Sequence, residues 1–323
     1  MDNREPALSH VPGEPMVVVV GPAGDTDATA MCDALARRGI SYAPVDPSQF
    51  EHSMHLDVRL RCDNGDDGRW TGELRTIDHT IAVEDVSAIY YRPPRLWVRE
   101  PGGNSITGPV RRMVPGPRAL SREAHARVTL YGMLASLPCR WVNHPGRYTD
   151  EHRLPLLTAA ANSGFRLPAS LLANNRQGVT DFACKHGKNV LCVPLVDPEA
   201  GAAYSRPVLR AEYQHHRLDG FLFQEYVERE VNVHVIVAGN RLFAFRTHED
   251  AYDLTTVTDE VASSIWDFQE DTGLGYTALD FAVPRDGPWV LTQIDPTAEW
   301  SWYAMQFDLP VADALVDALT KAR

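Results

Sequence analysis

The apolar run MVVVV, at positions 16–20, is the feature that most constrains how this chain can fold. A run of this length, bounded by turn residues, is typical of a buried strand and is far too short to cross a membrane. The loop GPAGDTD follows, then a helical spacing of apolar residues around Met31, Leu35 and Ala36, then a short strand that ends at 44–46. This order predicts a strand–helix–strand unit near the start of the chain.

The loop after the first strand raises the question of a nucleotide site. It contains Gly21 and Gly24, but it has neither the GxGxxG pattern of dinucleotide-binding loops nor the GK[ST] ending of a phosphate-binding loop. A tight turn from strand to helix is therefore the favoured interpretation, and a nucleotide site at this loop is the alternative.

Strands and helices continue to alternate along the rest of the chain. Two β-rich runs joined by Gly239-Asn240 predict a hairpin, and two more strands flank a turn at Asp286-Gly287. The turn-rich ribbon around DNGDDG and WTGEL suits a further hairpin. Other strands are predicted at 88–92, 189–196 and 221–227, helices at 120–137, from Thr149 or Asp150 to Gly164, at 180–187, around 261–273 and at 308–319, and a loop at 101–117.

Length and charge narrow the class of protein. A chain of 323 residues with 44% hydrophobic content is long enough for two or three packed units. Its net charge of -12 argues against a nucleic-acid partner, because affinity for a phosphate backbone rests on a basic surface. The five cysteines are scattered without a CxxC pair, so neither a disulfide framework nor a zinc ribbon is expected. We expect a cytoplasmic protein with no membrane segment.

The order of short motifs along nearly the whole chain resembles the ATP-grasp ligases that mature ribosomal peptides, the microviridin-type graspetide enzymes. The resemblance implies an α/β and α+β architecture, with a Rossmann-like pre-ATP-grasp domain (1–145), a central lid domain (146–227) and a C-terminal α+β domain (228–323). The motifs that carry it, in order, are VVVVGPAGDTDA, the RG of ARRGI, PVD, WTGEL, IYYRPP, WVNHP, GFRLPASLLANN, FQEYV, LDFAV and LPVADAL.

The same resemblance implies ATP and Mg²⁺ as cofactors and a precursor peptide as partner, with an Asp or Glu side chain of the peptide activated as an acyl phosphate. Two lysines of the family neutralise the triphosphate. Here Arg153 stands at the first position, which keeps the positive charge in a different shape, and Val193 stands at the second, which supplies none. We therefore expect weak binding of the nucleotide.

The resemblance also assigns a metal site near the end of the chain. Its pattern is an aspartate on one strand, followed by a glutamate and an asparagine two residues apart on the next strand, where alternation puts both on one face. Asp280 matches the aspartate, Gln293 stands for the glutamate and Asp295 for the asparagine. Two carboxylates remain, which leaves either a single weakened metal site or a vestige of one.

Two further elements complete the implied site. The segment FQEYVERE (223–230) resembles the adenine hinge, with backbone groups of Glu225 and Val227 on the base and Glu228 on the ribose. His234 lies where the family has an arginine, and a histidine is largely neutral at pH 7. We assign it with Arg153 to the catalytic group, while a histidine that is simply packed and hydrogen-bonded in its strand is the alternative.

Two aromatic and basic clusters have a structural and a functional interpretation. Arg92 and Arg95, beside tyrosines and prolines, are expected either in ordinary surface ion pairs or in contact with a peptide carboxylate. Trp300 and Trp302, two residues apart, are expected to share a face and either pack in the core or line an acceptor groove.

Two functions stay open at this stage. The chain is either an active ligase with an altered nucleotide site or a degenerate pseudo-ligase that binds a precursor peptide or a second maturation enzyme without turnover. A small-molecule carboxylate–amine ligase is a third, less favoured possibility. Hydrolases lack motif support, because neither GxSxG nor HExxH occurs. The sequence leaves the oligomeric state open, a homodimer included.

Overall fold

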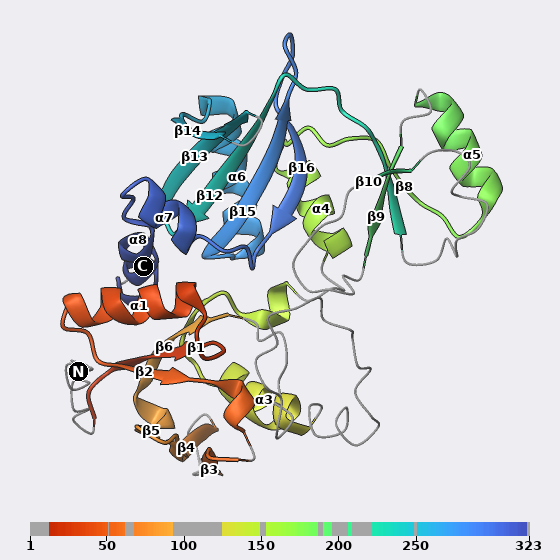
Figure 1. The fold of residues 1–323 in the computed structure, drawn as a ribbon. Coiled ribbons are helices and arrows are strands. Elements are labelled where there is room, and N and C mark those ends of the chain that lie inside the picture. Colours follow the sequence, from red (N-terminus) through yellow and green to blue (C-terminus); the bar gives the residue numbers. More distant parts are fainter. Residues whose placement is uncertain are drawn as a thin grey trace, which may run out of the picture. The chain divides into compact units, whose positions relative to one another are not determined.

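The computed structural model describes residues 13–50, 52–61, 68–92, 125–148, 153–186, 190–195, 206–208, 221–248 and 251–321. The chain divides into two compact units (Figure 1). Unit 1 comprises residues 1–146 and 301–323, and unit 2 comprises residues 147–300. Within the described residues, no helix has the length and apolar character that a membrane crossing requires.

A four-stranded parallel sheet forms the centre of unit 1, in the order β2-β1-β6-β7. Strand β1 (Met16–Val20) lies between β2 (Tyr42–Val45) and β6 (Val86–Tyr91), and β7 (Arg140–Val142) follows β6. All five residues of β1 are buried, because a central strand of a parallel sheet has both faces covered. The predicted strand–helix–strand start is confirmed by β1, α1 (Thr26–Arg37) and β2.

The last two helices of the chain belong to unit 1. Helix α8 (Val311–Thr320) contacts α1, β6 and β7, and α7 (Ser301–Gln306) precedes it. The predicted final helix at 308–319 is confirmed with a later start, directly after Pro310. The sequence did not predict α7. The division into three domains, which places these helices in the C-terminal domain, stays a prediction.

A small antiparallel sheet in the order β3-β4-β5 completes the regular structure of unit 1. The predicted hairpin corresponds to β3 and β4, although most of its DNGDDG turn lies outside the described residues. The predicted helix at 120–137 is described only from residue 125 and contains one π-helical turn. The bounds are β3 (His55–Arg61), β4 (Arg69–Arg75), β5 (Thr80–Ala82), 3-10 helices η1 (Pro47–Gln49), η2 (Val83–Asp85) and η4 (Pro145–Arg147), π-helix η3 (Arg127–Tyr131) and α3 (Gly132–Ala135).

Unit 2 contains a five-stranded antiparallel sheet in the order β14-β13-β12-β15-β16. Both predicted hairpins are confirmed, and Gly239 turns the first with a positive φ of 56°. The edge strand β14 was not predicted. The bounds are β12 (Val231–Ala238), β13 (Arg241–His248), β14 (Ala251–Thr255), β15 (Tyr276–Val283) and β16 (Val290–Asp295).

One face of this sheet carries the hydrophobic core of unit 2. Helices α4 (Arg153–Asn162) and α6 (Asp259–Thr272) lie on the same side of the sheet, behind its strands in Figure 1. Residues of alternate strand positions, among them Val235, Leu279 and Phe281, pack there with Phe268 of α6 and Ala160 of α4. Because strand side chains alternate, the intervening residues lie on the opposite face.

A second sheet of unit 2 has the order β10-β9-β11-β8 and carries helix α5 on one face (Figure 1). Val179 and Ala183 of α5 pack against Val190 and Phe223. Helix α5 begins four positions before the predicted start at 180, because Asn175 caps it by accepting a hydrogen bond from the Gly178 amide. The bounds are β8 (Ser170–Leu172), α5 (Arg176–Lys185), β9 (Val190–Pro194), β10 (Arg206–Val208) and β11 (Phe221–Glu225). With a parallel sheet in unit 1 and antiparallel sheets elsewhere, the α/β and α+β fold class is confirmed.

We predict that Gly273→Ala destabilises unit 2. Gly273 ends α6 with φ 64°, and an added Cβ would collide with the Arg147 guanidinium, which donates a hydrogen bond to the Thr272 carbonyl at 2.6 Å. We expect the free energy of unfolding in urea to fall by about 1–2 kcal/mol. Gly287→Ala is the control, because an added Cβ there meets only ordinary contacts at 3.7 Å or more. Equal stability of the two variants would contradict the prediction.

A second prediction concerns the contact between α1 and α8. The Asp317 carboxylate accepts hydrogen bonds at 2.8 Å from Lys321 and from Arg38, and these partners hold its pKa below the usual value. A lowered pKa means that the stabilisation is complete above the ordinary carboxyl pKa and is lost as the pH falls through the lowered value. Asp317→Asn should therefore cost about 0.5–1 kcal/mol at pH 7 and progressively less in acid, measured by urea unfolding across pH. Asp57→Asn, at a side chain 83% exposed, should change nothing at either end of the range.

Candidate functional site

A row of polar side chains crosses the five-stranded sheet of unit 2 on the face away from the core. His234 of β12 lies directly opposite Asp280 of β15, which lies directly opposite Gln293 of β16. Residues directly opposite in antiparallel strands point to the same face. The pattern of the sheet therefore brings two of the predicted metal positions and the predicted catalytic histidine together.

Asp295 lies on the same face, one step further along β16. Between it and Gln293, Ile294 packs against the core cluster on the other face. This alternation agrees with the sequence expectation that residues 293 and 295 share a face. A bulge between Asp280 and Phe281 leaves Thr292 outside the paired register, and its hydroxyl donates to the Asp280 carbonyl at 2.9 Å.

His234 and Asp280 contact each other directly. The Nδ1 of His234 is 2.7 Å from Oδ1 of Asp280, and the side chains are 13% and 39% exposed. The imidazole also lies beside the Phe245 ring, with 6.3 Å between the ring centroids. The structure thus supports the alternative interpretation of His234 as a packed, hydrogen-bonded histidine, while its catalytic role stays a prediction.

Asp295 is engaged by its own turn. Its Oδ1 accepts hydrogen bonds from the backbone amide and from the hydroxyl of Thr297, both at 2.8 Å. A carboxylate that accepts from an amide two residues later forms a local turn at the end of the strand. Asp295 therefore closes β16, in addition to any role that it has toward a ligand.

These residues do not fit a pair of protein-held divalent ions. Mg²⁺ is held in proteins by carboxylate oxygens in a near-octahedral arrangement. Gln293 offers only a neutral amide oxygen, while one oxygen each of Asp280 and Asp295 already accepts hydrogen bonds. Across the parts of the chain that the structure describes, no three His, Cys, Asp or Glu side chains gather in a group that could hold a metal ion.

Arg153 and Gln293 border one small cavity. Arg153 is the first residue of α4, and the cavity of ≈ 30 Å³ is large enough for about one water molecule. The buried Gln224 also borders it and donates a hydrogen bond to the Ser170 hydroxyl at 3.1 Å. The structure thus brings the residue in the first lysine position close to one predicted metal position. The full lining is Arg153, Leu156, Leu157, Leu222, Gln224, Thr292, Gln293 and Ile294.

Val193 lies on the cavity side of the second sheet. It is directly opposite Leu222, which borders the small cavity, and it is 4% exposed. Lys185 cannot take its place from the same face, because α5 packs on the opposite face through Phe223. Lys188, the next lysine along the sequence, lies outside the described residues.

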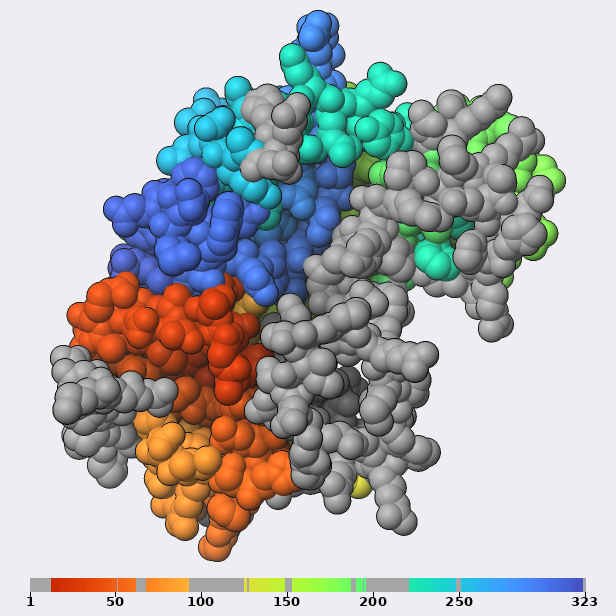
Figure 2. Space-filling model, viewed as in Figure 1, coloured from red at the N-terminus to blue at the C-terminus, as the bar shows by residue number. Residues whose placement is uncertain are grey.

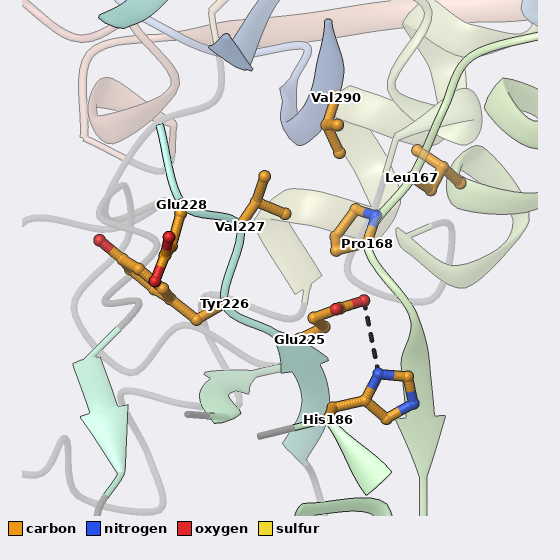
Figure 3. Close-up of a pocket in the computed structure, with 8 residues that line it drawn as sticks. All are labelled: Leu167, Pro168, His186, Glu225, Tyr226, Val227, Glu228 and Val290. Carbon is orange, nitrogen blue, oxygen red and sulfur yellow. Dashed lines mark ion pairs between the residues drawn. The ribbon is translucent and has the colours of Figure 1, made fainter. Parts of the chain in front are cut away.

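The three predicted hinge residues line a second and larger cavity (Figure 3). Its volume of ≈ 490 Å³ is in the range of small-molecule sites. His186 Nδ1 lies 3.5 Å from Oε2 of Glu225, and the Glu225 amide donates to the Ala169 carbonyl at 2.9 Å. The full lining is Leu167, Pro168, His186, Glu225, Tyr226, Val227, Glu228 and Val290.

Two consecutive residues of β11 border different cavities. Gln224 borders the small cavity and Glu225 the large one, and consecutive side chains of a strand point to opposite faces. In Figure 3 the Glu225 carboxylate points toward His186 and Pro168, whereas Tyr226 and Glu228 point away from them. The predicted nucleotide residues thus fall into two groups, one with Arg153 and one with Glu225.

Sequence reasoning missed a buried ion-pair cluster in unit 1. Arg92 is 7% exposed, and its guanidinium lies 3.3 Å from Asp27 and 3.5 Å from Asp25. Burial raises the pKa of Asp27, although Arg92 and the hydrogen bonds from Ser301 act in the opposite direction. The ion pair of Arg92, expected at the surface, is therefore buried, and Arg95 lies outside the described residues. The signal in the sequence was the pair of aspartates, Asp25 and Asp27, at the start of the helix. Asp25 caps α1, which explains the tight turn between the first strand and this helix.

The two tryptophans after β16 do not share a face. Trp300 is 1% exposed, whereas Trp302 is 46% exposed. The expectation of a shared face assumed a strand, but Trp302 lies in α7, where residues two apart point in different directions. Trp300 is a core residue.

Several solved structures are similar in fold to this chain. The macrocyclase MdnC of Microcystis aeruginosa MRC, bound with precursor peptide MdnA, matches with a TM-score of 0.78 and 19% identity over 95% of this chain and 100% of that chain. A RiPP-associated ATP-grasp ligase of Chryseobacterium gregarium, in complex with ADP and a leader and core peptide, matches with 0.75 and 18% over 94% and 96%. The ATP-grasp ligase PsnB, complexed with a phosphomimetic variant of minimal precursor, Mg and ADP, matches with 0.69 and 19% over 94% and 98%.

Neither the protein-family models nor the curated protein sequences contain a match to the chain. At 18–19% identity the structural likeness establishes the fold, and the chain therefore has the ATP-grasp fold that the sequence resemblance implied. The matches span almost the full length of both partners, so the fold is shared as a whole.

We predict that Val193→Lys tightens the binding of ATP. A lysine at this position would lie on the same face of the sheet as Leu222, which borders the small cavity. It would add the positive charge that Val193 lacks. A desolvated contact between charges contributes on the order of 2 kcal/mol, so we expect the dissociation constant of ATP measured by calorimetry to fall by roughly thirtyfold.

Val193→Met is the matched control, because it adds length without charge. It should leave the affinity unchanged. Low-micromolar binding of ATP by the unaltered chain, or an equal gain in both variants, would contradict the assignment of position 193 to the phosphates.

Proposed function

We propose that this chain acts in the maturation of a ribosomally made peptide, as an ATP-grasp protein that binds a precursor peptide. The proposal is supported by the match in fold to MdnC, bound with precursor peptide MdnA, and to PsnB, complexed with a phosphomimetic variant of minimal precursor. It is also supported by the order of family motifs along the sequence. A small-molecule ligase of the same fold is less favoured, because the motifs of the N-terminal region resemble the peptide enzymes.

The site favours binding of the peptide without turnover. The observation that carries this choice is Val193, a buried apolar side chain in the position of a phosphate-binding lysine. Gln293 removes a second charge, in a position where the family has a glutamate. Charged groups that act together on a transferring phosphoryl group are strongly non-additive, so the loss of two removes most of their effect.

A nucleotide would supply chemical activation of a carboxylate if it were bound. The groups of this chain suited to hold it are the guanidinium of Arg153 for phosphate, the carbonyl of Glu225 and the amide of Val227 for the base, and Glu228 for the ribose. The Glu225 amide is not available, since it donates to Ala169. With one charged side chain in place of two, the chain should hold the nucleotide weakly.

An active ligase with shifted ligands is the second candidate. It is favoured by the position of Arg153, which borders the same cavity as Gln293 and keeps a positive charge there. Asp280, at 39% exposure, also keeps one carboxylate accessible on the polar face. The two candidates differ in whether Asp295 matters for the product.

The partner in the first candidate is the precursor peptide, a second maturation enzyme, or both. The chain would then present the peptide to the enzyme that modifies it.

We predict that a precursor peptide binds to this chain but loses no water through it. The test is co-expression with each small open reading frame beside the gene, followed by pull-down and mass spectrometry of the peptide. Asp295→Ala should change neither binding nor the mass, because no metal–phosphate complex forms at that side chain. Asp286→Ala is the matched control, in the exposed turn between β15 and β16 that projects from the surface (Figure 2).

Loss of water that requires both the chain and Asp295, and that survives Asp286→Ala, would show an active ligase. Absence of any bound peptide and of any bound enzyme would remove the proposed function itself.

A further inference from the structure

We propose that the His234 imidazole engages the Asp280 carboxylate where a divalent cation would otherwise bind it. The polar face of unit 2 therefore binds its ligand without a metal ion held by the protein. The inference rests on the proposed function, because it concerns the same face of the same sheet. It adds the reason why this face departs from a metal site.

The contact between His234 and Asp280 is imposed by the sheet. β12 is paired on both sides, with β13 and with β15, and the register sets His234 opposite Asp280. The neighbours of His234 in the strand, Val233 and Val235, are 2% and 0% exposed in the core. The backbone at position 234 is therefore held from both sides, and the imidazole stays within reach of the carboxylate.

The hydrogen bond engages the carboxylate that a cation would need. The Nδ1 of His234 lies 2.7 Å from Oδ1 of Asp280, and the imidazole is only 13% exposed. A cation that uses this oxygen has to break a hydrogen bond to a carboxylate and leave a mostly buried imidazole nitrogen to find another partner. Both consequences oppose binding of the metal.

The two other positions add no compensating ligand. Gln293, directly opposite Asp280, brings an uncharged amide. Asp295 accepts two hydrogen bonds from Thr297 through one oxygen. Gln293 therefore carries no negative charge, and Asp280 and Asp295 each have one oxygen already engaged in hydrogen bonds. At Asp280, the hydrogen-bond partner is His234.

The experiment is a titration of the full-length protein with Mn²⁺, in which free Mn²⁺ is measured by electron paramagnetic resonance with and without ADP. His234→Phe keeps an aromatic ring but removes the contact with Asp280. We expect Mn²⁺ to bind on the order of tenfold more tightly, because the metal no longer has to break a hydrogen bond to the Asp280 carboxylate. His55→Phe, the same change at an exposed strand position of unit 1, should have no effect.

A double-mutant cycle separates competition by His234 from the missing charge at 293. Gln293→Glu alone should give little gain while His234 holds Asp280, and a clearly larger gain in the His234→Phe background. Equal gains in the two backgrounds, or unchanged or weaker Mn²⁺ binding by a folded His234→Phe, would overturn the inference. If His234→Phe does not fold, a gain of tenfold or more from Gln293→Glu alone overturns it, and a gain of less than about threefold supports it.

The titration contains no peptide, so its outcome is independent of the pull-down. Tighter Mn²⁺ binding by His234→Phe would stand even if no precursor peptide were found. Binding of a peptide would likewise stand if His234 proved to have no influence on the metal.

Discussion

The register of β12, β15 and β16 is the constraint on which the candidate site depends. Antiparallel pairing places His234, Asp280 and Gln293 in one row across three strands, of which β12 is distant in the sequence from the β15–β16 hairpin. The row has a single orientation, because a shift by one residue would move these polar side chains into the core face. Burial of the alternate residues, such as Val235 and Leu279, thus determines which face of the sheet the polar side chains occupy.

The same alternation divides the second sheet of unit 2. Gln224 and Glu225 are neighbours in the chain, yet they border separate cavities on opposite faces of β11. Phe223 anchors one face to α5, and Val193 with Leu222 defines the other. The face with Val193 is apolar at the position where the family resemblance implies a positive charge.

Local signals in the sequence predicted most of the elements correctly. The hairpins at Gly239-Asn240 and Asp286-Gly287 follow from turn chemistry, and α6 begins and ends at residues that favour caps, Thr258 and Gly273. The misses are elements with weak local patterns. Strand β14 is a polar edge strand, and α7 is a short helix with no buried residue, so neither shows the periodicity that identifies a strand or a helix.

The sequence by itself determined that residues 293 and 295 share a face, because side chains alternate along a strand. It also shows that Val193 and Gln293 carry no charge. The tertiary structure alone decided what those residues contact. The partner of Asp280 is His234, 46 positions away, and the partner of Arg92 is Asp27, 65 positions away. A periodic pattern reports the direction of a side chain relative to its own strand or helix, whereas a contact between distant residues depends on how strands pair, and pairing is a property of the whole sheet.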